Sequence, residues 1–421
     1  GGSGGGSGGF TEAVGELDPS FNGNGYKIKD DPYSSSSPDR AYKVLVLDDG
    51  SIMLIGSCKK TDINKNKICV AKFNADGSVN TSFGTNGFEF YNISSGADNA
   101  YTATLYNNKI YIGGTCSSQF CVLRLNLDGS LDDSFGLPSG SVRTGYIYKD
   151  ILGNGFEEGN SIYVSNDGIY IGTRCDNRFC VAKFLSDGSD FDTNFGTNGY
   201  QIFDPTGNLE FGKSLIIHNN KIVIGGYFFL GTTDNKFGLA KFDMDGSVDW
   251  GFGDGGYKII DIPGTNIDVA QALLIHNDKY LLSGFCGNDT SSRKFCIARI
   301  DLDGSFDETF NSTGYNILDI PESTSEFIES MLIQNDNKIV VGGMCTQNTG
   351  FDFCLARFND NGTLDTSFNN PNGYIITNIT IWSDYLKSIA IQIHNNIYKI
   401  IAGGYCSING SDDHFCLARF K

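Results

Sequence analysis

The chain has 421 residues, 40% of them hydrophobic, and a formal net charge of −18 at pH 7. The apolar content is sufficient for a buried core, whereas the negative charge argues against nucleic acid or an anionic membrane as a partner. No run approaches the ~18 apolar residues of a membrane-spanning helix, so we expect no membrane insertion.

The chain opens with GGSGGGSGG, which has the composition of a flexible linker. We exclude residues 1–9 from the fold and expect residues 10–421 to form one domain. After the linker, a phenylalanine that closes a turn-rich segment recurs at spacings of 52 to 62 residues. A period in this range is typical of a repeat architecture and predicts seven copies in one ring or solenoid. The repeated residues are Phe21, Phe83, Phe135, Phe195, Phe252, Phe310 and Phe368.

Each copy contains four short runs with alternating or continuous apolar residues. In the fourth copy these runs are Glu210–Ile217, Lys221–Tyr227, Phe237–Phe242 and Gly256–Asp261. Asn-Asn and Asp-Gly pairs between such runs are hairpin signals. Four antiparallel strands per copy predict the blade of a β-propeller, and therefore an all-β, seven-bladed β-propeller.

The two ends of the chain each supply part of a copy. The run Gly25–Asp30 resembles a fourth strand with no blade before it, and the chain ends after the third-strand run Phe415–Phe420. We expect these two runs to pair in one sheet. Such pairing closes a ring and removes free sheet edges.

The repeated pattern of GKIxxxG, then FxxARF, then DGSLDxSFGxxGY resembles the delta-sixty repeat of bacterial secreted and surface proteins. The resemblance covers residues 17–421 and implies a propeller, but no particular chemistry. Regularly placed cysteine pairs depart from the usual pattern of that family.

The twelve cysteines fall into six pairs, each on two runs joined by a short loop. A structural metal site needs four ligands, and each copy offers two sulfurs without a regular histidine. We therefore predict six disulfides, each within one blade, and an extracellular or cell-surface location. The fourth copy has Phe228 and Gly238 in place of the pair. The predicted pairs are Cys58–Cys69, Cys116–Cys121, Cys175–Cys180, Cys286–Cys296, Cys345–Cys354 and Cys406–Cys416.

The third run of every copy carries a base, and the turn segment carries an aspartate in six copies and Asn80 in the other. This regular combination predicts an internal salt bridge in six blades and weaker pairing for Lys72. The other bases are Arg124, Lys183, Lys241, Arg299, Arg357 and Arg419. Their expected partners are Asp132, Asp192, Asp249, Asp307, Asp365 and Asp18, respectively.

Another acid opens the first run of every copy, beside an Asp or Asn that ends the fourth run. We expect these acids at one mouth of the central channel, with no base assigned to them. They either accept backbone N–H bonds that fix the connections or bind a cation such as calcium, or a basic group. No other cofactor is expected. The candidate metal ligands are Asp39, Asp98, Glu157, Glu210, Asp268, Glu326 and Asp384.

Aromatic residues are frequent in the variable segments expected on that same face. They are predicted either to bind a ligand or to pack over the blades. The candidate ligand-binding residues are Tyr33, Phe156, Phe211, Phe327, Trp382 and Tyr385, with Phe229 and Phe351 in the same segments.

No catalytic residues are predicted. We expect His218, His276 and His394 to be exposed turn residues and His414 to lie alone in a loop, so no Ser/His/Asp constellation can be argued. The sequence favours a non-enzymatic recognition or adhesion propeller that binds a glycan or a protein at the cell surface. The alternatives are a self-assembling subunit of a surface layer or filament, and a carbohydrate-active enzyme.

Overall fold

The computed structural model describes residues 15–32, 38–60, 63–153, 155–289, 291–347, 350–394 and 397–421. The predicted linker, residues 1–9, lies outside these ranges, as does Tyr33. The described residues form β-strands and turns, and no helix occurs among them. The prediction of an all-β fold is confirmed. None of the described segments is a helix that could cross a bilayer.

The strands form four-stranded antiparallel units with the order inner, second, third and outer strand, as in β2-β3-β4-β5. The inner strands are β2 (Asp39–Val46), β6 (Asp98–Tyr106), β12 (Glu157–Ser165), β16 (Leu209–His218), β20 (Ile267–His276), β24 (Glu326–Ile333) and β28 (Asp384–His394). The second strands are β3 (Ile52–Lys60), β7 (Lys109–Cys116), β13 (Gly168–Cys175), β17 (Lys221–Gly231), β21 (Lys279–Gly287), β25 (Ile339–Gln347) and β29 (Ile397–Ser407).

The third strands are β4 (Lys65–Phe73), β8 (Gln119–Leu125), β14 (Arg178–Phe184), β18 (Asp234–Asp243), β22 (Lys294–Ile300), β26 (Gly350–Phe358) and β30 (Asp413–Phe420). The outer strands are β5 (Phe88–Tyr91), β11 (Tyr146–Lys149), β15 (Tyr200–Phe203), β19 (Tyr257–Ile260), β23 (Tyr315–Leu318), β27 (Tyr374–Thr377) and β1 (Tyr26–Lys29). A two-stranded hairpin of β9 (Pro138–Ser139) and β10 (Val142–Arg143) stands apart. One parallel pairing, between Asn235 and Ile267, joins two units into an eight-stranded sheet.

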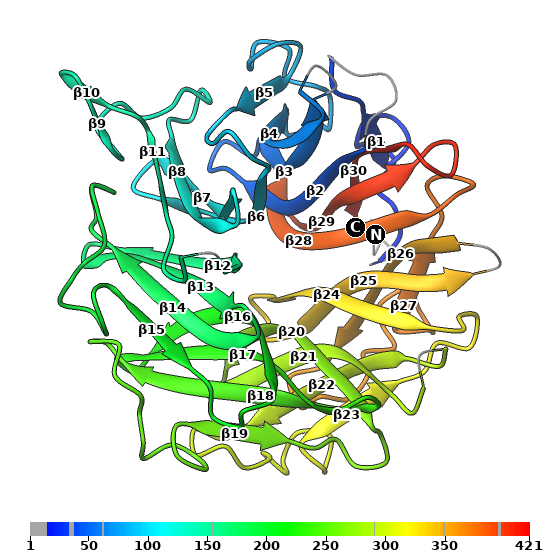
Figure 1. The fold of residues 1–421 in the computed structure, drawn as a ribbon. Coiled ribbons are helices and arrows are strands. Elements are labelled where there is room, and N and C mark those ends of the chain that lie inside the picture. The colour runs from blue at the N-terminus through cyan, green and yellow to red at the C-terminus, as the bar shows by residue number, and fades with distance from the viewer. Residues whose placement is uncertain are drawn as a thin grey trace, which may run out of the picture.

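The units are arranged around a central axis, with the inner strands nearest the middle and the outer strands at the periphery (Figure 1). In three units, the hairpin between the inner and second strands has two successive residues with positive φ: Asn107-Asn108, Asn219-Asn220 (49° and 54°) and Asn277-Asp278. Such a pair is the requirement of a type I′ turn, whose twist matches that of the flanking strands. The Asn-Asn hairpin signal in the sequence therefore has a direct conformational cause.

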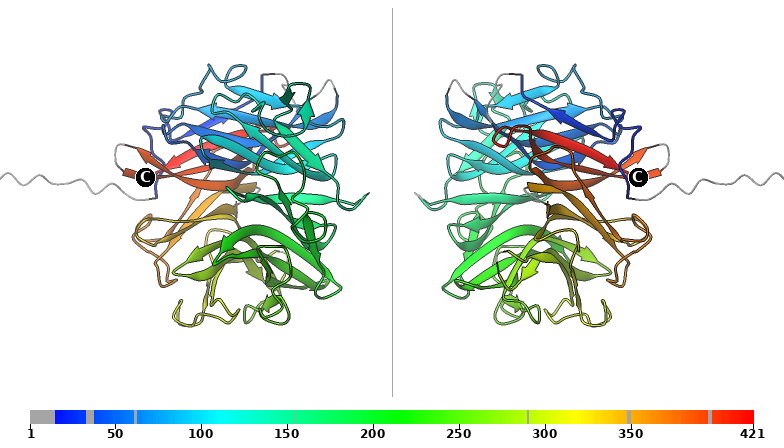
Figure 2. Two further views of the ribbon diagram at one scale, coloured as in Figure 1. Left: turned by 90° about the vertical axis from the view of Figure 1, so that its left-hand side faces the viewer. Right: turned by 90° about the vertical axis from the view of Figure 1, so that its right-hand side faces the viewer.

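The first and last strands of the chain lie in one sheet. β1 pairs with β30 in antiparallel register, from Tyr26 opposite Ala418 to Lys29 opposite Phe415. The side views show the red C-terminal strand against the blue N-terminal segment (Figure 2). The predicted pairing of these two runs is present, and we refer to this place as the seam.

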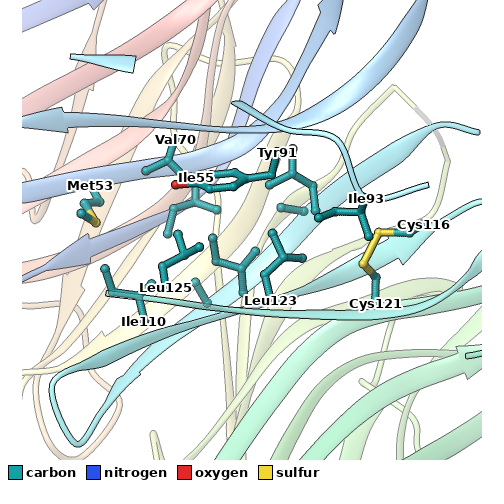
Figure 3. Packing of buried hydrophobic residues seen from close by; sticks show 14 of the residues in the cluster. Met53, Ile55, Val70, Tyr91, Ile93, Ile110, Cys116, Cys121, Leu123 and Leu125 are labelled. Atoms are coloured by element: carbon teal, nitrogen blue, oxygen red, sulfur yellow. A yellow bond between two sulfur atoms is a disulfide. The ribbon is translucent and has the colours of Figure 1, made fainter. Parts of the chain in front are cut away.

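The hydrophobic core lies between neighbouring sheets. In one such layer, Ile55 and Val70 of one sheet pack against Ile110 and Leu123 of the next, all of them fully buried (Figure 3). Because both faces of most sheets are covered, the second and third strands are continuously apolar. Complete burial of such side chains contributes about 1.5–3 kcal/mol each.

The disulfides link the second and third strands of single units, with Cα–Cα distances of 5.5 to 5.8 Å. All six predicted pairs are confirmed. In the unit without a disulfide, the ring of Phe228 lies over Gly238, where an added Cβ would come within 2.3 Å of the ring. Six disulfides suggest an extracellular or otherwise oxidising environment.

Candidate functional site

Every inner strand contains a register shift at the same place, as between Ala41 and Lys43 in β2. Such bulges redirect a side chain out of the regular pleat. The opposite strand supplies a glycine where the bulged backbone comes close: a Cβ on Gly56 would lie 1.9 Å from the carbonyl oxygen of Arg40. A glycine at this position in six second strands therefore leaves room for the bulge: Gly56, Gly114, Gly226, Gly284, Gly343 and Gly404.

The bulges line a central cavity of about 450 Å³. It is bounded by residues of all the inner strands, so it occupies the channel around which the sheets are arranged. The residues at or beside the bulges are Tyr42, Lys43, Tyr101, Thr102, Glu158, Asn160, Ser161, Lys213, Ser214, Gln271, Glu329, Ser330, Lys387 and Ser388.

Charges in this cavity are unevenly paired. Lys387 Nζ lies 2.8 Å from Glu329 Oε1, and Glu158 Oε2 lies 3.1 Å from Arg174, just outside the cavity. Lys43 and Lys213 form no ion pair with any described residue. Burial lowers the pKa of both lysines, although Glu158 and Glu329 act in the opposite direction on Lys213. The cavity therefore holds two unpaired lysines in a protein of strongly negative charge.

An aromatic row runs from blade to blade and ends at two residues of the cavity wall, Tyr42 and Tyr101. Ring centroids of successive members lie 4.6 to 6.3 Å apart. Arginine side chains cover part of the row: Arg293 lies over the ring of Phe327, and Arg40 lies over that of Tyr405. The row consists, in order, of Phe285, Phe327, Phe351, Tyr385, Tyr405, Tyr42 and Tyr101.

The predicted ligand-binding residues are only partly brought together. Phe327 and Tyr385 belong to the aromatic row, whereas Phe211 stacks on Tyr227 at 4.8 Å and lies under Arg174. These three lie in inner strands, and Phe229 and Phe351 in other strands, so the expectation that they are loop residues is wrong. Trp382 and Phe156 lie outside the strands, 45% and 36% exposed.

Sequence reasoning missed Lys43, Lys213, Tyr42 and Tyr101. Each lies at or beside a bulge, where the period of two that assigns side chains to faces is broken. The glycine in the following strand, such as Gly56, Gly114 or Gly226, is the signal that could have located the bulge.

The acid that opens each inner strand is fully buried, at 0–1% exposure. Asp98 accepts the backbone N–H groups of Ile93 and Ser94, and Asp384 those of Ile379 and Thr380. This arrangement supports the structural alternative, in which the carboxylates fix the connection from the previous blade.

The expectation that these acids lack a base is wrong for Asp98 and Asp268. Lys67 Nζ, from the preceding third strand, lies 2.9 Å from Asp98 Oδ2, and Lys236 Nζ lies 3.5 Å from Asp268 Oδ2. Lys67 and Lys236 are the third-strand residues that pair with the second-strand Cys58 and Phe228. This third-strand position therefore lies at the junction with the next blade. The residues at this position are Lys67, Gln119, Arg178, Lys236, Lys294, Asp352 and His414.

Within the described ranges, Asp39 is the one acid of this set that belongs to a group of three potential metal ligands. The calcium site predicted for the whole set stays a prediction. The partners of that group, Asp30 and His414, lie at the seam.

All four histidines differ from expectation. His218 and His394 end the inner strands β16 and β28 and are half-buried, so they are not exposed turn residues. His414 lies in β30 and is 3% exposed, so it is not a loop residue. His276 is 2% exposed because it ends an inner strand beneath the turn segment, where its Nδ1 lies 3.1 Å from Arg299 Nη1. Burial lowers the pKa of His276, so the ring accepts this hydrogen bond in its neutral form.

The predicted salt bridges occur at the opposite end of the third strands. All six Asp partners lie near their bases, from 2.6 Å for Arg299–Asp307 to 3.9 Å for Lys241–Asp249. Burial opposes ionisation of Asp307, but bonds from Thr309, Arg299 and Lys279 outweigh it and hold its pKa below the usual range. The Arg299 guanidinium also lies 4.7 Å from the ring centre of Phe310, so the repeated Phe packs against the pair.

Lys72, with Asn80 in place of an aspartate, forms no ion pair among the described residues. Its Nζ donates to the carbonyl of Leu127 at 3.1 Å. These bridges serve the blades themselves and contain no exposed reactive group.

Comparison with known proteins supports a β-propeller architecture. Five segments match a family described as a β-propeller domain of unknown function, DUF5122: residues 47–83, 107–135, 219–252, 285–310 and 334–368. They cover corresponding parts of five units and leave the unit of β12 to β15 unmatched. No curated protein matches the chain.

Solved structures with related folds are distant in sequence. A protein of unknown function from Dyadobacter fermentans is 12% identical with a TM-score of 0.49, over 94% of this chain and 98% of that chain. The β-propeller domain of the Trilobed protease from Pyrococcus furiosus is 10% identical with a TM-score of 0.43, over 92% and 94%. A subtype N10 neuraminidase-like protein of an influenza virus from a little yellow-shouldered bat is 9% identical with a TM-score of 0.40, over 94% and 98%. The family match and the radial arrangement of four-stranded sheets identify this chain as a β-propeller.

Proposed function

We propose that this protein is an extracellular, non-enzymatic recognition propeller that binds an acidic sugar in its central cavity. In this proposal the propeller has seven blades of the delta-sixty kind, and β1 completes the blade of β28, β29 and β30. The observation that carries the proposed function is the pair of lysines, Lys43 and Lys213, that line the cavity without an ion pair among the described residues.

The cavity suits a small polar ligand. Its volume of about 450 Å³ lies within the roughly 300–1,000 Å³ of small-molecule sites. Serine hydroxyls line it, and that of Ser388, 2% exposed, has no hydrogen-bond partner. The equivalent Ser161 and Ser330 bind the backbone of the following inner strand. The Ser388 hydroxyl is therefore a buried polar group of the cavity wall without a partner.

The chemistry of the lining favours a carboxylated sugar over a neutral one. An ammonium group that has lost water without gaining a counterion is stabilised by a bound anion. Tyr42 and Tyr101 offer aromatic faces and hydroxyls to a sugar ring. The aromatic row, which contains the predicted residues Phe327 and Tyr385, leads from this place toward the start of the inner strands and could contact further units of a glycan.

Binding without hydrolysis is proposed because both carboxylates of the cavity, Glu158 and Glu329, are held in ion pairs. A glycosidase uses two carboxyl groups, one of which is an acid with a raised pKa. Here Glu158 is paired with Arg174 and Glu329 with Lys387. Both carboxylates are therefore engaged by a base, and neither is set apart as a general acid.

The test is a glycan array followed by calorimetric titration with glucuronate, galacturonate, glucose and inorganic phosphate. We expect binding of a uronate, at least tenfold weaker binding in Lys43→Gln and Lys213→Gln, and none of glucose. Lys59→Gln, a partly exposed strand lysine away from the cavity, is the matched control. Binding of phosphate alone, equal binding of glucose, or release of product from an array ligand would contradict the proposal.

A further inference from the structure

At the seam, three potential metal ligands converge. One ligand atom each from Asp30, Asp39 and His414 lies within 4.8 Å of the others. Asp30 directly follows β1, Asp39 opens β2, and His414 lies in β30. The group therefore unites residues from both ends of the chain.

The polar atoms of this group are buried and lack ordinary partners. Asp39 and His414 are 0% and 3% exposed. Asp39 Oδ1, Asp30 Oδ1 and both ring nitrogens of His414 form no hydrogen bond. His414 Nδ1 nevertheless lies 3.0 Å from Asp30 Oδ1. The two atoms are therefore close but not hydrogen-bonded, an arrangement compatible with two ligands of one ion.

Among the described residues, no base forms an ion pair with Asp39, and Lys29 acts on Asp30, Asp31 and Asp39 only through longer-range attraction. Asp39 Oδ2 accepts the N–H of Asp31 at 3.2 Å. Lys29, the base nearest in sequence, has its Nζ 5.4 Å from the ring centre of Phe88 and forms no ion pair within the described ranges. Arg40 is bound to Asp413 at 2.8 Å. Buried carboxylates without a base are costly unless they coordinate a metal.

We propose that Asp30, Asp39 and His414 bind one divalent transition metal ion, with Zn²⁺ the best match. Zinc takes imidazole nitrogen together with carboxylate oxygen, whereas calcium prefers oxygen ligands alone. The other ring nitrogen of His414 lies 3.5 Å from Asp412 Oδ2. A carboxylate at this place orients a metal-binding histidine.

The same position in another blade shows what the ion replaces. Lys67 occupies the place of His414 and pairs with Asp98, the counterpart of Asp39. A dication between two carboxylates and a neutral imidazole would supply the positive charge that Lys67 supplies there. It would also link the N-terminal segment to the last strand and stabilise the seam.

The test uses the full chain, treated with chelator and then given Zn²⁺, Co²⁺, Ca²⁺ or Mg²⁺ alone. We expect one Zn²⁺ per chain by titration, a rise in Tm with Zn²⁺ but not with Ca²⁺ or Mg²⁺, and visible absorption bands for bound Co²⁺. Asp30→Asn, at a half-exposed ligand, should weaken Zn²⁺ binding at least tenfold.

Two further variants separate metal binding from general stability. His414→Lys installs the base of the Lys67 junction and should abolish the Zn²⁺-dependent rise in Tm while the metal-free protein stays folded. His218→Gln changes a histidine beside Asp278 at a distant turn and should leave Zn²⁺ binding intact. The proposal would be overturned if the parent did not bind Zn²⁺. It would also be overturned if Asp30→Asn and His414→Lys bound Zn²⁺ as tightly as the parent. If His414→Lys fails to fold, the Co²⁺ spectra of the parent and Asp30→Asn still decide.

Discussion

Two junctions between neighbouring blades use the same backbone positions with different charges. At the first, Lys67 Nζ bonds Asp98 and the carbonyl oxygens of Ser94 and Gly96 at 2.8–2.9 Å. At the seam, His414 stands in place of Lys67, and Asp30 and Asp31 lie beside Asp39. Burial and these two aspartates raise the pKa of Asp39 to about 9.

The difference teaches that the buried acid is a constant part of the connection, whereas its counter-charge is a variable part. Where a lysine supplies the counter-charge, as Lys67 and Lys236 do, the buried acid is neutralised by the protein's own side chain. At the seam the junction depends on something added, and we propose that this is a metal ion. The predictions below alter these junctions, from the largest expected effect to the smallest.

Removal of the N-terminal partner should break the seam completely. Deletion of residues 10–30 removes β1 and also Asp18, the 2.9 Å partner of the fully buried Arg419. We expect a sharp fall in Tm and aggregation through the exposed edge of β30. Differential scanning calorimetry and light scattering measure both effects, with deletion of residues 1–9 as the control. A truncated protein that melts like the parent and stays monomeric would show that closure does not depend on β1.

Loss of the lysine at the first junction should cost somewhat less. Lys67→Met leaves Asp98 buried without its base, and breaking a buried ion pair in this way costs about 3–5 kcal/mol. Urea unfolding measures the change in the free energy of unfolding. Lys65→Met, at an exposed lysine of the same strand, is the matched control and should change it by less than about 1 kcal/mol. Equal losses in the two variants would mean that the junction ion pair contributes little.

At a third junction, the contribution to the free energy of unfolding should depend on pH. Asp352 stands in the place of Lys67 and faces Asp384, and burial followed by Asp384 raises the pKa of Asp352 to about 6. A raised carboxyl pKa contributes stability at pH values below the unfolded pKa near 3.8, and this contribution is lost as the pH rises through about 6.

Asp352→Asn should therefore stabilise the protein at pH 7.5 by about 1–3 kcal/mol, with little effect near pH 4. The amide can keep the contact with Asn378, whose Nδ2 lies 2.9 Å from Asp352 Oδ1. Thermal melts of the two proteins from pH 4 to 8 measure the difference. A constant difference over this range would contradict a titrating Asp352.

The sequence by itself determined the repeat, the four-stranded unit, the cysteine pairs and the salt bridges beside the repeated phenylalanines. These features depend on residues close in the chain, such as Cys116 and Cys121, five residues apart. The cysteine pairs and the salt bridges each recur in six of the seven copies, and most join residues of one copy, so spacing alone reveals them.

Only the tertiary structure decided which residues meet between blades and in the channel. Lys67 and Asp98 belong to different sheets, and His414 and Asp39 lie near opposite ends of the chain, so their contacts depend on how neighbouring sheets pack. Lys43 and Lys213 face the cavity because a bulge interrupts the alternation of side chains in their strands. Periodicity reports the register within a strand, but it carries no information on the packing of one sheet against the next.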